Sequence, residues 1–303
     1  MIITSEQFQK TVANKINFEG VGLHTGENCK VTLHPAPVNY GIKFLINNKL
    51  ISSDVNNVIS TNRGTNLLKD DIVIMTVEHL LSALYALEID NLKIELSNSE
   101  LPILDGTSQI FLKKIIKVGY TIQNKKREEF LVDKLISFKS SKGVQFYVIP
   151  DSKYKFTYHL EYQNIDILNQ EFSISLENDN YETEISSAKT FCLLSELLNL
   201  YNHGLIKGGS LKNAIVYIDK KLDKNELNKI KNIFNMNVDI DYSNPILNNI
   251  KNISKYEAAK HKTLDLIGDS YLLGMRIRGH LIAYKSGHES NVEFIKYLKK
   301  NYL

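Results

Sequence analysis

The stretch KHKTLDLIGDS, residues 260–270, places His261, Asp265 and Asp269 four residues apart, with the apolar residues Leu264, Leu266 and Ile267 between them. On a helix, residues four apart lie on one face, about 6 Å apart along the axis. His261 and Asp265 can therefore point at one cation. Buried imidazole and carboxylate groups cost free energy unless they are paired or bound to a metal. The spacing alone leaves two interpretations open: a helix with an i,i+4 hydrogen bond that faces water, and a helix with a metal-binding face.

A second segment, TVEHLLSALYALE at residues 76–88, is predicted to form a helix with Thr76 as its N-cap. His79 lies off the leucine stripe of this helix, which weakens its interpretation as a core histidine. With His261 and Asp265 it would supply two imidazoles and one carboxylate, the number of protein ligands usual at a catalytic zinc site. Fe²⁺ would also fit this ligand set.

Three further polar residues would complete an acid–base site. Glu78 projects beside His79, where it could accept a proton from a water activated by zinc. His288, in AYKSGHES, is predicted to lie in a loop after a strand, where acid–base groups are common. Asp269 would then hold the His288 imidazole in its protonated form.

The composition is that of an ordinary globular protein, with 303 residues, 43% hydrophobic residues and a formal net charge of +3. Lys and Arg are spread along the chain, so we expect no nucleic-acid partner. Two distant cysteines, Cys29 and Cys192, exclude a disulfide framework and a thiolate zinc cluster. No signal peptide and no apolar run of bilayer length is visible. We therefore expect a cytoplasmic protein, and peripheral contact with a membrane-borne substrate remains compatible with this.

Both halves of the chain run strands first and then helix and strand, which predicts two similar α+β domains. The polar segment TIQNKKREE, residues 121–129, is interpreted as the linker between an N-terminal domain, 1–120, and a C-terminal domain, 130–303. A helix is expected around residues 190–202.

Several motifs together resemble the zinc-dependent deacetylases of lipid A biosynthesis, the UDP-3-O-acyl-N-acetylglucosamine deacetylase family. They run in the family's order from about residue 16 to about residue 291. The motifs are FEGVGLHTG, TVEHLLSAL, ILDGTS, AKTF, GLIKGGSLKNAIV, HKTLDLIGD and AYKSGH. Because several motifs in register are more specific than any one of them, the resemblance covers nearly the whole chain.

The resemblance implies a fold, a substrate and a role for each matching residue. The implied fold has two α+β domains, each a sheet layered against helices, with the helices packed between the sheets and a small insert in each domain. The implied reaction releases acetate from UDP-3-O-(3-hydroxyacyl)-N-acetylglucosamine, an early committed step of lipid A biosynthesis. The matching residues are His79, His261 and Asp265 as zinc ligands, Glu78 as general base, His288 with its partner Asp269 as stabiliser and acid, and Thr190 as an aid to the oxyanion.

The resemblance also implies substrate contacts. Lys262 matches a lysine on the diphosphate side of the substrate, and Phe191 matches an aromatic ring near the sugar. The stretch FCLLSELLNLYNHGLIKGGS, residues 191–210, matches the family's acyl-chain passage. Its lining positions are Leu193, Leu197, Ile206 and Ser210. His24 is expected to have a structural role, and Asp105 with Gly106 is expected to make a tight turn.

The sequence leaves two alternatives to this function open. A zinc amidase acting on a different acylated amino sugar would use the same site residues. A non-catalytic α+β binding module is a different class, and the mixed charge pattern gives it little support. We expect a monomer without a fused dehydratase domain.

Overall fold

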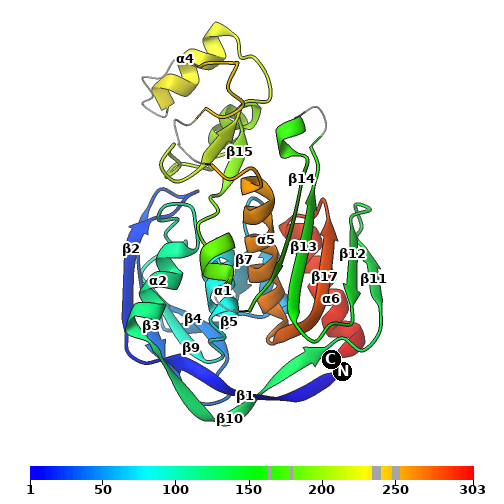
Figure 1. Ribbon diagram of the computed structural model, residues 1–303. Helices are drawn as coiled ribbons and strands as arrows, with labels where there is room; N and C mark the ends of the chain where they lie inside the picture. The colour runs from blue at the N-terminus through cyan, green and yellow to red at the C-terminus, as the bar shows by residue number, and fades with distance from the viewer. Residues whose placement is uncertain (163–164, 178–179, 234–239, 248–252) are drawn as a thin grey trace.

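Two sheets flank a central layer of helices (Figure 1). The computed structural model describes residues 1–162, 165–177, 180–233, 240–247 and 253–303. The first sheet has the strand order β2-β3-β9-β4-β5. Its strands are β2 (Ile16–Val21), β3 (Asn28–Pro35), β9 (Leu92–Leu96), β4 (Ile42–Ile46) and β5 (Lys49–Ser52). Buried residues alternate with exposed ones along the start of β2 and with half-buried ones along β4, as expected for a sheet with one face against the core.

The second sheet contains the first strand of the chain as well as strands from the second half. Its main path has the order β1-β10-β17-β12-β11, and β13 joins β17 while β14 joins β13. Its strands are β1 (Ile2–Val12), β10 (Tyr120–Leu131), β17 (Arg276–Tyr284), β12 (Gln145–Ile149), β11 (Ile136–Lys139), β13 (Tyr154–Leu160) and β14 (Gln170–Ser175). Figure 1 shows that the β1–β10 ribbon runs below the helices from one sheet to the other.

The helices between the sheets are α1 (Glu78–Ala86), α2 (Gln109–Val118), α5 (Glu257–Ser270), which continues into η5 (Tyr271–Leu273), and α6 (His288–Tyr302). Helix α5 is buried along most of its length, and the polar residues His261, Asp265 and Asp269 are among its buried positions. A Cβ atom at Gly268 would lie 2.1 Å from the Glu78 carbonyl oxygen. Glycine at this position therefore lets α5 contact the first residue of α1 directly.

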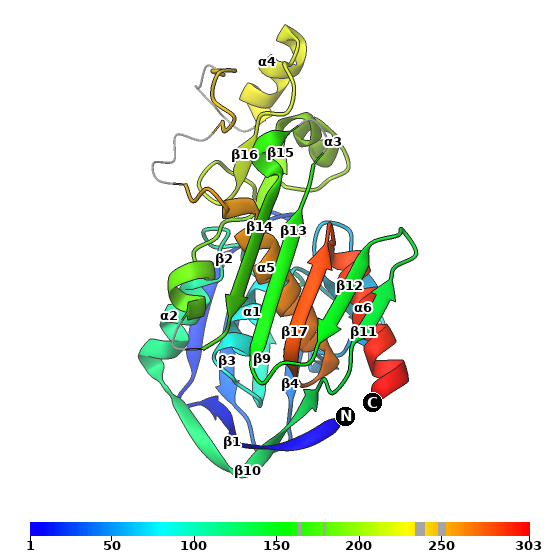
Figure 2. The same cartoon turned by 45° about the vertical axis from the view of Figure 1, so that its right-hand side comes forward.

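Each half carries a small insert. The first insert is a three-stranded sheet of β6 (Val58–Ser60), β7 (Asn66–Lys69) and β8 (Ile72–Ile74), preceded by η1 (Val55–Asn57). The second insert lies beyond one end of α5 (Figure 2). It contains the pair β15 (Phe191–Leu193) and β16 (Ile215–Tyr217) with η4 (Leu194–Glu196), α3 (Leu197–Asn202) and α4 (Lys224–Ile233). Two short elements, η2 (Asp166–Leu168) and η3 (Tyr181–Ile185), flank β14. The predicted α+β fold with helices between sheets is confirmed.

Three local predictions differ from the structure. Residues 121–129 lie within β10, and they are mostly polar because the β1–β10 ribbon is exposed over much of its length; the domain boundaries themselves remain a prediction. The expected helix at 190–202 begins as β15, because Phe191 pairs with Ile215 of β16. Thr76 does not cap α1; it has a φ of 60°, and its hydroxyl donates to Glu100.

No helix among the described residues has the length and apolar character that a membrane crossing requires.

Candidate active site

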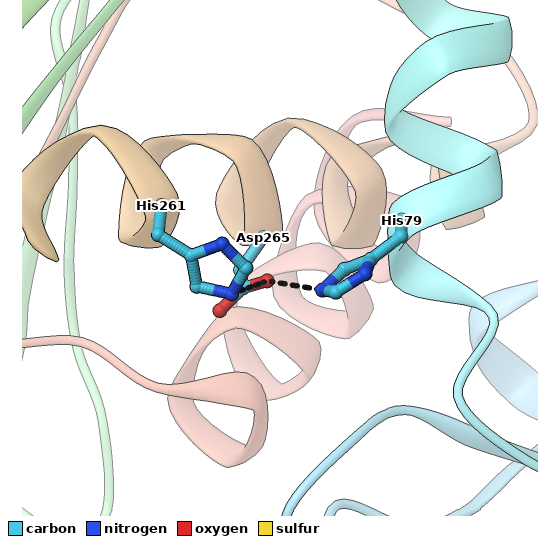
Figure 3. Close-up of side chains that lie close together, drawn as sticks. All are labelled: His79, His261 and Asp265. Atoms are coloured by element: carbon cyan, nitrogen blue, oxygen red, sulfur yellow. Dashed lines mark ion pairs between the residues drawn. The ribbon is translucent and has the colours of Figure 1, made fainter. Parts of the chain in front are cut away.

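The three predicted metal ligands lie together between α1 and α5 (Figure 3). His79 is the second residue of α1, and His261 and Asp265 follow one another on one face of α5. Asp265 Oδ1 lies 3.4 Å from His261 Nε2 and 3.7 Å from His79 Nε2. One ligand atom from each residue lies within 4.8 Å of the others, and all three side chains are buried. The i,i+4 spacing and the close packing of the two helices produce this cluster.

The donor atoms of this cluster fit a divalent cation. Asp265 Oδ1 is buried and has no hydrogen-bond partner, although it faces both imidazoles. His261 Nδ1 donates to the Ala188 carbonyl at 3.1 Å, so the Nε2 lone pair is directed toward Asp265. Burial and the neighbouring His261 lower the pKa of His79 to about 3, which leaves its ring neutral and able to bind a metal. A cation would complete the polar interactions that these atoms lack.

Glu78 and His288 stand beside the cluster. Glu78 Oε1 lies 4.0 Å from His288 Nε2, and Glu78 Oε2 accepts a hydrogen bond from the Thr65 backbone at 2.9 Å. Burial raises the pKa of Glu78 to about 7, although the His288 charge opposes the rise. A carboxyl group with a pKa near neutrality can both take and give a proton.

His288 is held by Asp269, which lies on α5 four residues after Asp265. Its Nδ1 donates to Asp269 Oδ2 at 2.9 Å, and its Nε2 lies 3.7 Å from Asp265 Oδ2. Burial alone would lower the pKa of His288, but Asp269 and Asp265 outweigh it and raise the pKa to about 9. The prediction that His288 lies in a loop is wrong: it begins α6, with Gly287 as the N-cap. The Gly287 backbone donates to the Ser290 hydroxyl and thereby fixes this helix start.

Two residues of the site were not found from the sequence, Thr65 and Asn291. The Thr65 hydroxyl donates to Asp269 Oδ1 at 2.5 Å, and the Asn291 amide donates to Asp269 Oδ2 at 2.9 Å. Thr65 therefore contacts both carboxylates, Glu78 through its backbone and Asp269 through its side chain. Asn291 follows His288 by three residues, a helical spacing that would have revealed it had α6 been predicted to start there. Nothing in the local sequence around Thr65 indicated its role.

Lys262, Phe191 and Thr190 border the same cluster. Lys262 Nζ forms an ion pair with Asp265 Oδ2 at 2.9 Å and lies 5.6 Å from the centre of the Phe191 ring. Although burial opposes it, Asp265 holds the pKa of Lys262 above its usual value. The Thr190 backbone is fixed by hydrogen bonds to Gly106 and Ile215.

Gly106 explains the fixed position of Thr190. A Cβ atom there would lie 1.8 Å from the Asn213 carbonyl oxygen, and its φ is 83°. The predicted turn at Asp105 and Gly106 is thus confirmed, and only glycine fits its second position.

Two cavities meet at this site. A polar cavity of about 340 Å³ is lined by the cluster residues, by Glu78 and His288, and by Lys262. An apolar cavity of about 90 Å³ lies between the second insert and residues of the first half, and Leu197, Ile206 and Ser210 are among the residues that line it. Leu193 lies in β15, outside the lining residues. Four residues belong to both cavities: Leu23, Arg63, Thr190 and Phe191.

His24 lies in the wall of the apolar cavity, buried in the turn after β2. Its backbone nitrogen donates to Glu100 Oε1 at 2.9 Å, and its Nε2 donates to the Arg63 carbonyl at 3.0 Å. These bonds support the expected structural role.

Two imidazoles and one carboxylate, with a buried acid–base pair beside them, are typical of metal-dependent hydrolases. A family model described as UDP-3-O-acyl N-acetylglycosamine deacetylase matches residues 9–236 and 220–300. The chain belongs to this family, and the resemblance inferred from its motifs is confirmed.

Curated relatives cover most of the chain. It is 38% identical over 301 residues to the bifunctional enzyme LpxC/FabZ of Chlorobaculum tepidum. The aligned region covers 96% of this chain and 64% of that protein. It is 37% identical over 292 residues to the UDP-3-O-acyl-N-acetylglucosamine deacetylase of Aquifex aeolicus, covering 96% of this chain and 93% of that protein. The corresponding deacetylase of Thermodesulfovibrio yellowstonii is 33% identical over 293 residues, with coverage of 96% and 91%. The chain thus spans 64% of the bifunctional relative and nearly the full length of the other two.

Proposed function

We propose that this protein hydrolyses the acetamide of UDP-3-O-(3-hydroxyacyl)-N-acetylglucosamine, releasing acetate, as a step of lipid A biosynthesis. One observation carries the proposal: the His79–His261–Asp265 cluster and its acid–base pair share a wall with an apolar cavity. A substrate with an acetamide near a single acyl chain would place one group in each cavity. Family membership and relatives named as deacetylases support the same reaction.

His79, His261 and Asp265 would hold the metal, which we propose to be zinc, with Fe²⁺ as the ion that the same ligand set would also accept. When bound, zinc would polarise the acetamide carbonyl and lower the pKa of the attacking water toward about 7. His261 is oriented for this by the Ala188 carbonyl, which fixes its tautomer.

Glu78 would act as the general base. Its Oε2 is occupied by the Thr65 backbone, which leaves Oε1 to take the proton of the water that adds to the acetamide carbon. The buried position that raises its pKa also makes it a competent proton donor in a later step.

His288 would stabilise the oxyanion that forms on the acetamide oxygen. Asp269 keeps it protonated and oriented through Nδ1, so that Nε2 faces the polar cavity. The Thr190 hydroxyl would donate a further hydrogen bond to the oxyanion. His288 or the protonated Glu78 then delivers a proton to the amine nitrogen, the carbon–nitrogen bond breaks, and acetate leaves.

The remaining residues would position the substrate. Lys262 would face the diphosphate, and Phe191 would pack against the sugar. The acyl chain would occupy the apolar cavity, which Leu197, Ile206 and Ser210 line. We further propose that the protein acts as a monomer in the cytoplasm and meets its lipid-bearing substrate by peripheral membrane contact.

Acetate release by the purified protein tests this proposal. The substrate is UDP-3-O-(3-hydroxyacyl)-N-acetylglucosamine, assayed before chelation, after chelation and after zinc is restored. We expect chelator-sensitive release that returns with about one equivalent of zinc. Release from the analogue without the 3-O-acyl chain at an equal rate would instead favour an amidase for a different amino sugar. If the metal-bound protein released no acetate from either substrate, the proposal would be contradicted.

A further inference from the structure

The wall shared by the two cavities contains one charged residue, Arg63, among the four residues that belong to both. A substrate that occupies both cavities has to pass this wall. Leu23, Thr190 and Phe191 make the rest of it, and Thr190 and Phe191 are fixed by the β15–β16 pairing. Arg63 comes from the turn between β6 and β7, so it belongs to the first insert.

The backbone of Arg63 is held in place from the core of the first half. Its φ is 61°, and its carbonyl accepts a hydrogen bond from His24 Nε2 at 3.0 Å. The His24 and Thr25 backbone nitrogens donate in turn to the buried carboxylate of Glu100. The position of Arg63 therefore does not depend on its own side chain, which is directed toward the second insert.

The Arg63 side chain joins the two inserts. Its Nη2 forms an ion pair with Glu196 Oε1 at 2.7 Å. Glu196 Oε2 also accepts a hydrogen bond from the Leu193 backbone at 3.2 Å. Glu196 ends η4 and directly precedes α3, whose residues Leu197 and Leu200 line the apolar cavity. The ion pair thus fixes the start of α3 relative to the first insert.

We propose that the Arg63–Glu196 ion pair determines specificity for substrates that carry a long acyl chain. The inference rests on the proposed function, because it assigns the apolar cavity to the acyl chain. The ion pair holds the α3 wall of this cavity against the first insert at the point where the chain enters. Without it, α3 moves away from the turn at 61–65, water enters the cavity, and binding of the apolar chain weakens.

The expected effect is moderate. The two side chains are 40% and 31% exposed, so the pair is screened by salt. Partly exposed ion pairs contribute little free energy to binding or stability. A contribution of this size corresponds to a change of about two- to fivefold in KM for the long-chain substrate. Reversal of one charge should have a larger effect, because it replaces attraction by repulsion between the inserts.

Steady-state kinetics of Arg63→Met, Glu196→Gln, Arg63→Glu and the exchanged pair Arg63→Glu/Glu196→Arg tests the proposal. Two substrates are compared, one with the long 3-O-acyl chain and one with a 3-O-acetyl group in its place. Lys126→Met serves as the control, since Lys126 forms an ion pair of 2.8 Å with Glu6 away from both cavities. Hydrogen–deuterium exchange of residues 193–202 is measured on the same proteins without substrate.

We expect Arg63→Met and Glu196→Gln to raise KM for the long-chain substrate about two- to fivefold, with little change in kcat. Arg63→Glu should raise it further, and the exchanged pair should restore part of it, because Glu196→Arg also removes the acceptor of the Leu193 backbone hydrogen bond. Hydrogen–deuterium exchange of residues 193–202 should be faster in the single variants than in the wild-type protein. An equal rise in KM for both substrates, or no restoration by the exchanged pair, would overturn the proposal. A wild-type protein inactive on both substrates would reject the proposed function, and the exchange data would still decide whether the ion pair fixes α3.

Discussion

The two walls of the candidate site differ in how they are built. Helices α1 and α5 make the metal-facing wall, and both belong to the main core. Short elements of the second insert make the apolar wall, and they enclose a small separate cluster of buried side chains. The first wall allows almost no displacement, because Gly268 touches the Glu78 backbone. The proposed function assigns chemistry to the rigid wall and chain selection to the smaller wall, which the core supports less.

The largest expected effect is on the rigid wall. Glu78→Gln should lower kcat about 10²- to 10⁴-fold while the metal content stays unchanged, because the side chain keeps its shape but loses its basicity. Acetate release and metal analysis of the same sample measure both quantities. Glu95→Gln, an exposed carboxylate on β9, is the control. Near-normal turnover of Glu78→Gln would remove Glu78 from the mechanism.

Thr65→Val should lower kcat about tenfold or more with little change in KM, because Asp269 loses a hydrogen bond to its buried charge. Thr65→Ser keeps the hydroxyl and should retain most of the activity. In an Asp269→Asn background, Thr65→Val should add less than it does alone, since its hydroxyl acts through Asp269 as well as lying 3.2 Å from His288 Nδ1. Full additivity of the two changes would show that Thr65 does not act through Asp269.

Gly268→Ala should destabilise the protein by about 1–3 kcal/mol and weaken metal binding, because the new methyl group would separate α5 from α1. Thermal unfolding and metal titration report the two effects. Gly287→Ala is the matched control, since a Cβ atom there meets nothing within 4 Å. An unchanged melting temperature for Gly268→Ala would mean that α1 and α5 can separate without cost, and the metal-facing wall would then not be rigid.

The smallest effect is expected on the apolar wall. Leu200→Ala should raise KM for the long-chain substrate about threefold, because part of the buried side chain faces the cavity. We expect kcat to change little, since Leu200 lies on α3 in the second insert and does not line the polar cavity that contains the metal cluster. Leu135→Ala, an exposed position, is the control. A loss in kcat larger than the change in KM would place chemistry on this wall too.

The rigid wall was also the more predictable one. His261 and Asp265 lie on one helical face, and that face could be read from their spacing alone. The insert was less predictable, because its apolar residues from Phe191 to Leu200 fit a helical period. The pairing of Phe191 with Ile215 turns the first three residues of that run into a strand, and this contact is not local.

Other differences have the same cause. The sequence around His288 predicts a loop, since the helix start at Gly287 lacks the usual capping side chain. Thr65 could not be predicted, because its two carboxylate partners are brought to it by α1 and α5. Residues 121–129 resemble a linker in composition because the ribbon they form is solvated.

The β1–β10 ribbon has a consequence for the order of folding. The first sheet and α1 draw on residues 16–96, so they can fold while the rest of the chain is being synthesised. β1 has to wait for β10, and the second sheet has to wait for β17 at 276–284. Such non-local pairings form slowly. His79 is therefore placed long before His261 and Asp265 are made, and we expect metal capture to coincide with the last stage of folding rather than to nucleate it.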